Sequence, residues 1–203
     1  MSRAYWEDNY RKYLTADTCD GWLNAHAREL LPGSRVLDLG CGRGTNIPDL
    51  LNLGVQLTAA DLNENAVSSV RERFGSALQA ADCFDMRCGL PYNDDCFDVV
   101  VADLSLHYFS WNETRQIIGE IRRILKPGGR LIARLHALEN LEHIPEKQIE
   151  EHYYLIDGLP RRYFVREEIE TLFSEWNLTD LQKKAIHRYN RIKHIFELAA
   201  QKR

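Results

Sequence analysis

The feature that most constrains this fold is an apolar run that leads into three glycines on alternate positions, Val36-Leu37-Asp38-Leu39-Gly40-Cys41-Gly42-Arg43-Gly44. Residues 35–39 are predicted to form a buried strand, because Pro32-Gly33-Ser34 precedes them and glycine follows them. Glycine lets the backbone turn sharply and lets a ligand lie close against it. The helix-like segment that follows presents unpaired N–H groups in its first turn. Strand, glycine loop and helix together predict a site for a nucleotide-type cofactor.

The spacing of the glycines separates the possible cofactors. The dinucleotide fingerprint is G-x-G-x-x-G with an acidic residue about 20 positions further on, whereas this loop reads G-x-G-x-G and carries Asp38 inside the strand's end. An inward carboxylate there suits a ligand with an ammonium group better than a pyrophosphate. A second acid, Asp61, closes the strand-like run 55–61, and a carboxylate at that place can accept both ribose hydroxyls of an adenosine. The sequence has no G-x-x-x-x-G-K-[ST] loop, which argues against a P-loop NTPase.

Five segments, in this order, resemble the motifs of the class I S-adenosylmethionine-dependent methyltransferases, in particular small-molecule methyltransferases of types 11 and 25. They are the glycine loop 36–44, the acidic strand end Asp61-Leu62, the adenine-contacting turn Ala81-Asp82-Cys83-Phe84, the fourth strand 97–103 and the turn 125–131 into the fifth strand. The resemblance covers about residues 30–140, and it implies S-adenosylmethionine as the cofactor. The cofactor-binding residues that it implies are Asp38, Gly40, Cys41, Gly42, Gly44, Asn46, Asp61, Leu62, Asp82, Cys83, Phe84, Asp103 and Leu104.

Length and composition indicate one ordinary globular domain over residues 1–203. The net charge is −4 and acids interrupt the basic clusters, so no nucleic-acid partner is expected. Without an apolar N-terminal run or a run of about 20 apolar residues, neither a signal peptide nor a membrane partner is expected. Five cysteines without a C-x-x-C pair predict a reduced, cytoplasmic protein without a metal site. The oligomeric state stays open.

Strand-like and helical segments alternate along the chain, which predicts an α/β fold. The alternation also predicts a mostly parallel sheet with helices on both faces, and the family resemblance implies a Rossmann-like, doubly wound sheet of seven strands with an antiparallel last strand. Asn63 and Asn112 are the expected N-caps of two helices, and a further helix is expected from Arg166 to about Trp176. The runs 178–189 and 192–200 are the expected last two strands. Ligands bind in the crevice outside the carboxyl ends of such strands.

Two segments outside the repeating pattern are expected to cover that crevice. Residues 1–30 are predicted to form a helical lid, in which Trp6, Tyr10 and Tyr13 share one helix face; core packing explains this stripe equally well. A second helical face follows Asp20 and contains Trp22, Leu23, His26 and Leu30. Residues 138–165 lack periodicity, and the resemblance implies that they form a substrate cap. The candidate substrate contacts are Trp6, Tyr10, Tyr108, Tyr153 and Arg161.

Methyl transfer from a sulfonium is an in-line displacement, so the protein mainly positions the acceptor and excludes water. The segment 102–106 lacks the [DNS]-P-P-[YFW] motif of amino-methylating nucleic-acid enzymes, and the Pro-Cys pair of cytosine-C5 enzymes is absent. We therefore expect a methyltransferase that acts on an O, N or S atom of a small molecule. His107 and His136 are the candidate bases, unless they only form hydrogen bonds in their loops. A protein or tRNA acceptor, a dinucleotide oxidoreductase and a catalytically silent S-adenosylmethionine-binding protein are the alternatives.

Overall fold

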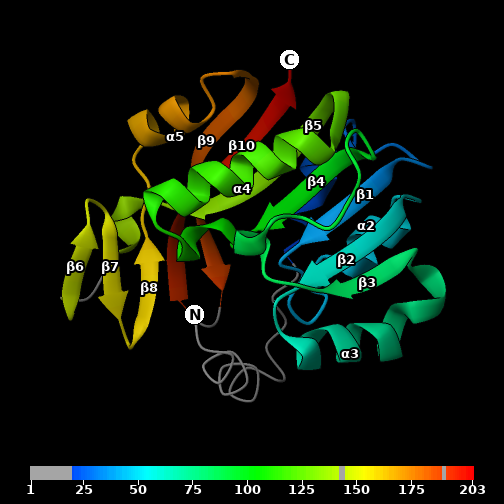
Figure 1. Ribbon diagram of the computed structural model, residues 1–203, viewed down its shortest axis with the longest axis horizontal. Helices are drawn as coiled ribbons and strands as arrows, with labels where there is room; N and C mark the ends of the chain where they lie inside the picture. Colours follow the sequence, from blue (N-terminus) through cyan, green and yellow to red (C-terminus); the bar gives the residue numbers. More distant parts are fainter. Residues whose placement is uncertain (1–19, 142–144, 189–190) are drawn as a thin grey trace.

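A sheet of seven strands in the order β3-β2-β1-β4-β5-β10-β9 runs through the computed structural model, which describes residues 20–141, 145–188 and 191–203 (Figure 1). The strands are β1 (Arg35–Leu39), β2 (Gln56–Asp61), β3 (Ala80–Cys83), β4 (Phe97–Asp103), β5 (Leu125–His136), β9 (Trp176–Arg188) and β10 (Arg191–Lys202). β1 to β5 pair in parallel, and β10 pairs antiparallel with both β5 and β9. The predicted fold class, including the antiparallel last strand, is confirmed.

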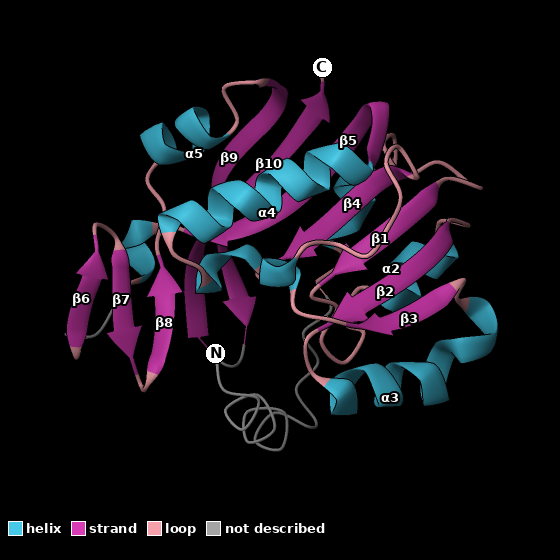
Figure 2. Cartoon of the chain, viewed as in Figure 1, coloured by secondary structure: helices cyan, strands magenta, loops and turns pink. Residues whose placement is uncertain are grey.

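Helices cover both faces of this sheet because its strands are apolar on both sides. α4 (Trp111–Ile124) and α5 (Arg166–Leu172) pack on one face, and α4 crosses in front of the sheet in Figure 2. The 3-10 helix η1 (Trp22–His26), α2 (Ile47–Asn52) and α3 (Glu64–Phe74) pack on the other face. In β1, Leu37 faces α4 whereas Val36 faces α2, as the alternation of a strand requires.

The helix starts show where local sequence chemistry decides the fold. Asn63 caps α3 as predicted, and its Oδ1 accepts from the N–H groups of Asn65 and Ala66 at 2.9 and 3.2 Å. The predicted cap of α4 is wrong, because the N-cap is Ser110 and Asn112 lies inside the first turn. Ser110 and Glu113 form a capping box in which each side chain binds the other residue's backbone N–H. This reciprocal pair satisfies two orphan donors, which a lone asparagine cannot do.

Two predicted helices are shorter in the structure than their patterns indicate. α5 ends at Leu172, and Trp176 is instead the buried first residue of β9, where its ring meets Phe173 edge-on. The face after Asp20 forms only the 3-10 helix η1, although its four apolar-face residues are all buried. The segment lies between Gly21 in the left-handed region and Pro32-Gly33, which leaves little length for α-helix to propagate.

The segment between β5 and α5 forms a small sheet of its own. After the 3-10 helix η5 (Leu138–Asn140), the strands β6 (Lys147–Glu150), β7 (Tyr153–Ile156) and β8 (Leu159–Arg162) pair antiparallel in sequence order. This sheet stands beside the main one in Figure 1. Arg162 is buried and joins it to the main body, because its guanidinium binds the Phe109 carbonyl at 3.2 Å as well as Glu150.

Candidate cofactor and acceptor site

Polar residues gather on one face of the sheet at the carboxyl ends of its central strands. Asp38 of β1, Asp103 of β4, and Arg134 and His136 of β5 alternate with apolar residues that pack against α4. Because strand side chains alternate between faces, all four lie on the face of η1 and α2. Each of the four is exposed at 7% or less, so this face buries a group of polar side chains close to the strand ends.

The glycines after β1 let the chain turn, and they also leave room for side chains of neighbouring segments. Gly40, Gly42 and Gly44 have φ of 79°, 54° and 85°, which is the left-handed region that favours glycine. A Cβ on Gly40 would lie 2.3 Å from Cβ of Ser105, in the loop after β4. A Cβ on Gly44 would lie 2.9 Å from Ile47 of α2. Protein atoms therefore already require glycine at the first and third positions, before any ligand is considered.

Asp38 of β1 is a completely buried carboxylate. Neither of its oxygens has a partner among the residues that the structure describes. Burial, followed by repulsion from Asp103, raises its pKa to about 7, and the nearby Asn46 side chain partly opposes the shift. Asn46 is itself held by Trp22, whose indole N–H donates to Asn46 Oδ1 at 3.1 Å. A buried carboxylate in this state is costly, and a cationic ligand group would supply the missing partner.

Asp61, at the end of β2, holds the glycine loop. One carboxylate oxygen accepts from the Gly42 N–H at 2.8 Å and the other accepts from the Asn63 N–H at 2.9 Å. Burial raises the pKa of Asp61, and these backbone donors oppose that shift. A carboxylate offers about four lone-pair directions, so these hydrogen bonds do not exhaust its capacity to accept. Contact with a ribose stays a prediction, and the structure adds a role in ordering the loop.

The predicted adenine-contacting residues lie beside Asp61, since Asp61 is opposite Cys83 in the β2–β3 ladder. The expected turn is partly wrong: residues 81–83 belong to β3 itself, and only Phe84 follows the strand. The Cys83 thiol lies 3.4 Å from the Leu62 carbonyl, and the Tyr92 hydroxyl donates to Asp82 at 2.8 Å. The parallel pairing of β2 and β3 therefore brings Leu62, Asp82, Cys83 and Phe84 together, as a common ligand site requires.

Asp103 lies in an ion network that the sequence analysis missed. Arg134 binds both of its carboxylate oxygens, at 2.7 and 2.9 Å, and Arg188 binds one of them at 2.9 Å. Burial alone would raise the pKa of Asp103, but Arg188 and Arg134 outweigh it and lower the pKa to about 2. Arg134 also binds Asp20 at 2.6 Å and lies over the Trp22 ring. Cofactor contact by Asp103 stays a prediction, because its carboxylate already serves two arginines.

Leu104 follows Asp103 with a φ of 52°, which is uncommon for a residue with a Cβ. Its N–H donates to the Arg134 carbonyl at 3.0 Å, so the neighbouring strand holds this conformation. A residue keeps such a strained backbone conformation only where its surroundings hold it there, and such residues are found most often at functional sites.

The two candidate bases come together although 29 positions separate them. The rings of His107 and His136 stack with centroids 3.8 Å apart, and Tyr108 and Tyr163 lie against them at 4.2 and 5.7 Å. Both imidazoles are buried, and burial lowers the pKa of each well below 6.5. They are therefore neutral near pH 7. Both nitrogens of His107 and Nδ1 of His136 lack hydrogen-bond partners in the described part of the chain.

The predicted substrate contacts have different outcomes. Tyr108 lies beside the histidine pair, and the Tyr153 hydroxyl donates to the Tyr108 carbonyl at 3.2 Å. Arg161 lies in β8, paired with Tyr154. Trp6 and Tyr10, together with the rest of the proposed lid up to residue 19, lie outside the described residues.

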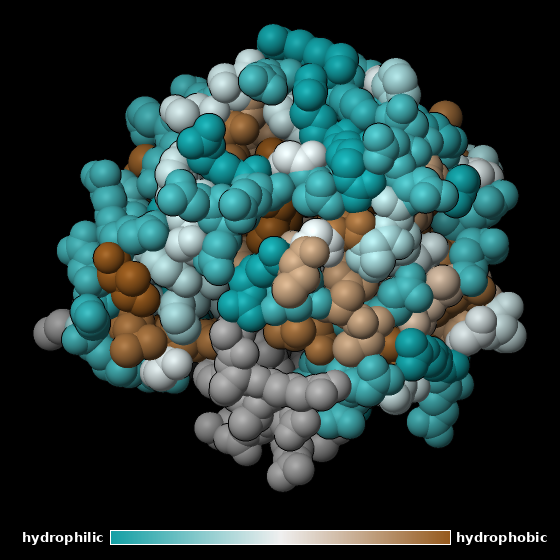
Figure 3. Space-filling model, in the orientation of Figure 1, coloured by the Kyte–Doolittle hydropathy of each residue, from teal (hydrophilic) through white to brown (hydrophobic). Residues whose placement is uncertain are grey.

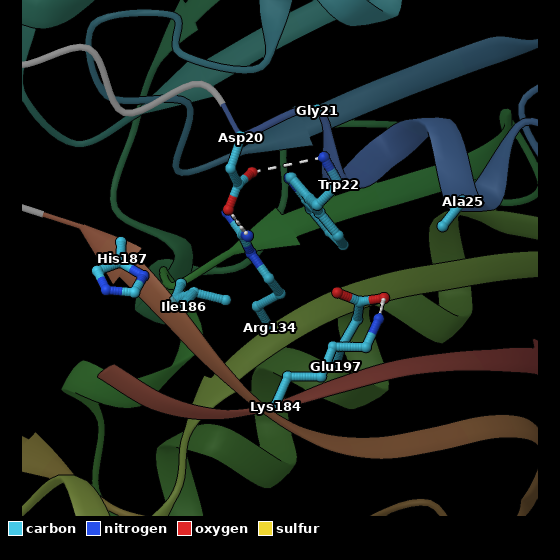
Figure 4. A pocket seen from close by; sticks show the side chains of 9 residues that line it. All are labelled: Asp20, Gly21, Trp22, Ala25, Arg134, Lys184, Ile186, His187 and Glu197. Atoms are coloured by element: carbon cyan, nitrogen blue, oxygen red, sulfur yellow. Dashed lines mark hydrogen bonds and ion pairs between the residues drawn. The ribbon is translucent and has the colours of Figure 1, made fainter. Parts of the chain in front are cut away.

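A cavity of about 430 Å³ lies on the same face, between η1 and the strands β5, β10 and β9 (Figure 4). Its lining residues are Asp20, Gly21, Trp22, Ala25, Arg134, Lys184, Ile186, His187 and Glu197. Its charged groups pair with one another, Asp20 with Arg134 and Lys184 with Glu197 at 2.6 Å. The polar lining is therefore largely satisfied by the protein itself, unlike the Asp38 and histidine sites.

The outer surface has fewer features that indicate a ligand site than the buried face does. Figure 3, which views the α4 side of the molecule, shows many hydrophilic side chains, with apolar side chains at the centre of the view and over β6 and β7, where Ile149 is 44% exposed. None of the helices in the described ranges has the length and apolar composition needed to span a bilayer. The same ranges contain no cluster of three His, Cys, Asp or Glu side chains that can hold a metal ion.

Comparison with known proteins agrees with this geometry. Residues 37–133 match the family model described as a methyltransferase domain. Sterol 4-C-methyltransferase of Caenorhabditis elegans is 28% identical over 173 residues, which is 79% of this chain and 49% of that protein. Demethylmenaquinone methyltransferase of Clavibacter sepedonicus is 32% identical over 134 residues, 65% of this chain and 53% of that protein. Probable tRNA methyltransferase 9B of Mus musculus is 31% identical over 144 residues, 70% of this chain and 31% of that protein.

The chain spans about half or less of the length of these curated relatives. Among solved structures, 1,6-didemethyltoxoflavin-N1-methyltransferase of Burkholderia thailandensis, with 1,6-didemethyltoxoflavin and S-adenosylhomocysteine bound, shares the fold with a TM-score of 0.76. The two are 22% identical, and the match covers 98% of this chain and 86% of that one. The ordered motifs, the strand order and the methyltransferase-domain match agree, and the chain belongs to the class I S-adenosylmethionine-dependent methyltransferase family, whose cofactor is S-adenosylmethionine.

Proposed function

We propose that this protein transfers a methyl group from S-adenosylmethionine to an O, N or S atom of a small-molecule acceptor. The observation that carries the proposal is Asp38, a buried carboxylate below the glycine loop that pairs with no cation in a salt bridge among the described residues. The α-ammonium of the cofactor's methionine part would give this carboxylate a charged partner. Asp61, on the neighbouring strand, retains lone pairs for the ribose hydroxyls.

The chemistry asks little of the protein beyond positioning. The sulfonium already activates the methyl group, which passes in line to the acceptor while the donor leaves as a neutral thioether. A neutral imidazole has one nitrogen that accepts a proton. In this proposal His107 or His136 accepts the acceptor's proton as the new bond forms, and the buried aromatic surroundings exclude water.

A tRNA acceptor is the second candidate, because one of the relatives is named a probable tRNA methyltransferase. Two observations favour the small molecule. The histidine pair is buried, at 1% and 5% exposure, so a base attached to tRNA would have to reach an enclosed position. The net charge of −4 also disfavours a polyanionic partner.

The test begins with titration calorimetry of the full chain with S-adenosylmethionine, S-adenosylhomocysteine and NAD. The proposal expects binding of the first two and none of NAD, and the reverse pattern would overturn it. An assay for released S-adenosylhomocysteine, run with a metabolite panel and with total tRNA, then separates the acceptor classes. Turnover with tRNA alone would favour the second candidate, and tight cofactor binding without turnover would favour a silent binding protein.

A further inference from the structure

Tyr92, in the segment between β3 and β4, holds a carboxylate at the end of β3. Its hydroxyl donates to Asp82 Oδ2 at 2.8 Å. Its ring makes two edge-on aromatic contacts, with Phe84 at 5.8 Å and with Phe97 at 5.1 Å. Burial, followed by the hydrogen bond to Asp82, raises the pKa of Tyr92, so the hydroxyl keeps its proton and stays a donor. Tyr92 therefore fixes the direction in which the Asp82 carboxylate points.

The segment that carries Tyr92 is itself bound to the C-terminal part of α4. Arg123 donates to the carbonyl oxygens of Leu90 and Tyr92, both at 2.8 Å. Glu120 binds Arg123 and also accepts from the Leu90 N–H at 3.0 Å. The Leu90 side chain is buried in the core on the α4 side of the sheet. Because the backbone is held at two carbonyls and one N–H, the position of the Tyr92 ring is set by the protein alone.

Asp82 lies close to the glycine loop. It pairs with Ala60 in the β2–β3 ladder, and the Ala60 carbonyl accepts from the N–H groups of Gly40 and Cys41 at 2.8 and 2.9 Å. Asp82 is only half-buried, so a ligand in the loop can reach it. An ionised carboxylate accepts hydrogen bonds in about four directions and donates none, so the bond from the tyrosine leaves it able to accept from a ligand.

We propose, resting on the binding of S-adenosylmethionine in the function proposed above, that Tyr92 is a positioning residue that orients Asp82 to accept from the exocyclic amino group of the cofactor's adenine. That amino group is a donor, whereas hypoxanthine carries a carbonyl oxygen in its place. The nearest donor of hypoxanthine is the N–H at position 1, which a carboxylate meets only after it turns. By preventing that turn, Tyr92 makes the site selective for adenine over 6-oxopurines.

The first experiment measures this selectivity by titration calorimetry of the full chain with S-adenosylhomocysteine and with S-inosylhomocysteine. The natural protein should bind the adenine compound at least about tenfold more tightly. Tyr92→Phe keeps the ring and removes the hydroxyl, and it should reduce the ratio of the two dissociation constants at least about threefold. A merely structural defect would weaken both ligands alike and leave the ratio unchanged. Tyr154→Phe is the matched control, since Tyr154 belongs to β7 in the small sheet, far from β3 in Figure 1.

The second experiment tests whether Tyr92 acts through Asp82. Asp82→Ala should remove the selectivity by itself, and Tyr92→Phe added to it should not change the ratio further, because residues in direct contact do not contribute independently. Equal affinity of the natural protein for the two ligands, an unchanged ratio in Tyr92→Phe, or a further loss of the same size in the double variant would each overturn the proposal. Failure of the natural protein to bind S-adenosylhomocysteine would instead contradict the proposed function, so the two failures are distinguishable.

Discussion

Asp38 should make the ligand-free protein less stable above pH 4, and Asp38→Asn should remove that cost. Its pKa is raised from 3.8 to about 7, first by burial and then by Asp103. Between these two pH values the folded protein keeps a proton that the unfolded chain releases. The free energy of unfolding therefore falls as pH rises through this window and levels off above about 7. The asparagine side chain is close in size and does not ionise.

The magnitude follows from the shift. One pKa unit corresponds to about 1.4 kcal/mol, so the whole shift from 3.8 to about 7 corresponds to about 4 kcal/mol. About 3 kcal/mol of this loss in the free energy of unfolding falls between pH 5 and pH 8. Relative to the natural protein, Asp38→Asn should therefore gain about 3 kcal/mol of stability over that interval.

Urea denaturation of both ligand-free proteins, followed by tryptophan fluorescence, gives the free energy of unfolding of each at pH 5 and pH 8. The quantity to compare is the change between the two pH values in the natural protein and in Asp38→Asn. Asp157→Asn is the control, because Asp157 is exposed in the β7–β8 turn and has a φ of 51°, which asparagine also tolerates. The same variants are then titrated with S-adenosylhomocysteine. Asp38→Asn should bind at least about tenfold more weakly, because a charge-assisted hydrogen bond contributes about 1.5–3 kcal/mol.

Two outcomes would refute the reasoning, each at a different step. A stability difference that does not change between pH 5 and pH 8 would show that burial does not perturb Asp38 as argued. Unchanged affinity for S-adenosylhomocysteine would show that this carboxylate is not the partner of the ligand's ammonium group. Calorimetry of the natural protein near pH 6.5, in buffers of different ionisation enthalpy, should also detect proton release on binding, since a cation next to Asp38 lowers its pKa.

Three further predictions follow from the same site. Asp61→Ala should weaken S-adenosylhomocysteine binding at least about tenfold and loosen the loop by removing the acceptor of the Gly42 N–H; an unchanged dissociation constant would exclude Asp61 from the site. Gly40→Ala should cost about 2 kcal/mol or more in urea denaturation, because its Cβ would lie 2.3 Å from that of Ser105. Adding Ser105→Gly should recover part of this loss, and no recovery would contradict the close contact as its cause. Arg134→Gln should cost about 3–5 kcal/mol, because it leaves a buried carboxylate at the end of β4 under-compensated; a loss below about 1 kcal/mol would mean that the second arginine suffices.

Local patterns predicted the parts of the fold that local chemistry controls. The bounds of β1 agree with the apolar run 35–39, which Ser34 and Gly40 delimit, and those of β4 agree with the segment 97–103 that the family resemblance implies. Asn63 was a correct cap, whereas the capping box of Ser110 and Glu113 was overlooked although its S-x-x-E spacing is visible in the sequence. The order of the strands in the sheet was not predicted, because periodicity does not specify which strands pair.

The ion network around Asp103 could not be predicted in the same way. Its partners lie 31 and 85 positions away, on β5 and β9. One signal was available: Arg134 interrupts the apolar run 131–135, and a charge in the middle of a buried strand needs a buried partner. The small sheet β6–β8 gave no comparable signal, because each of its strands has four residues, too few to show a clear alternation.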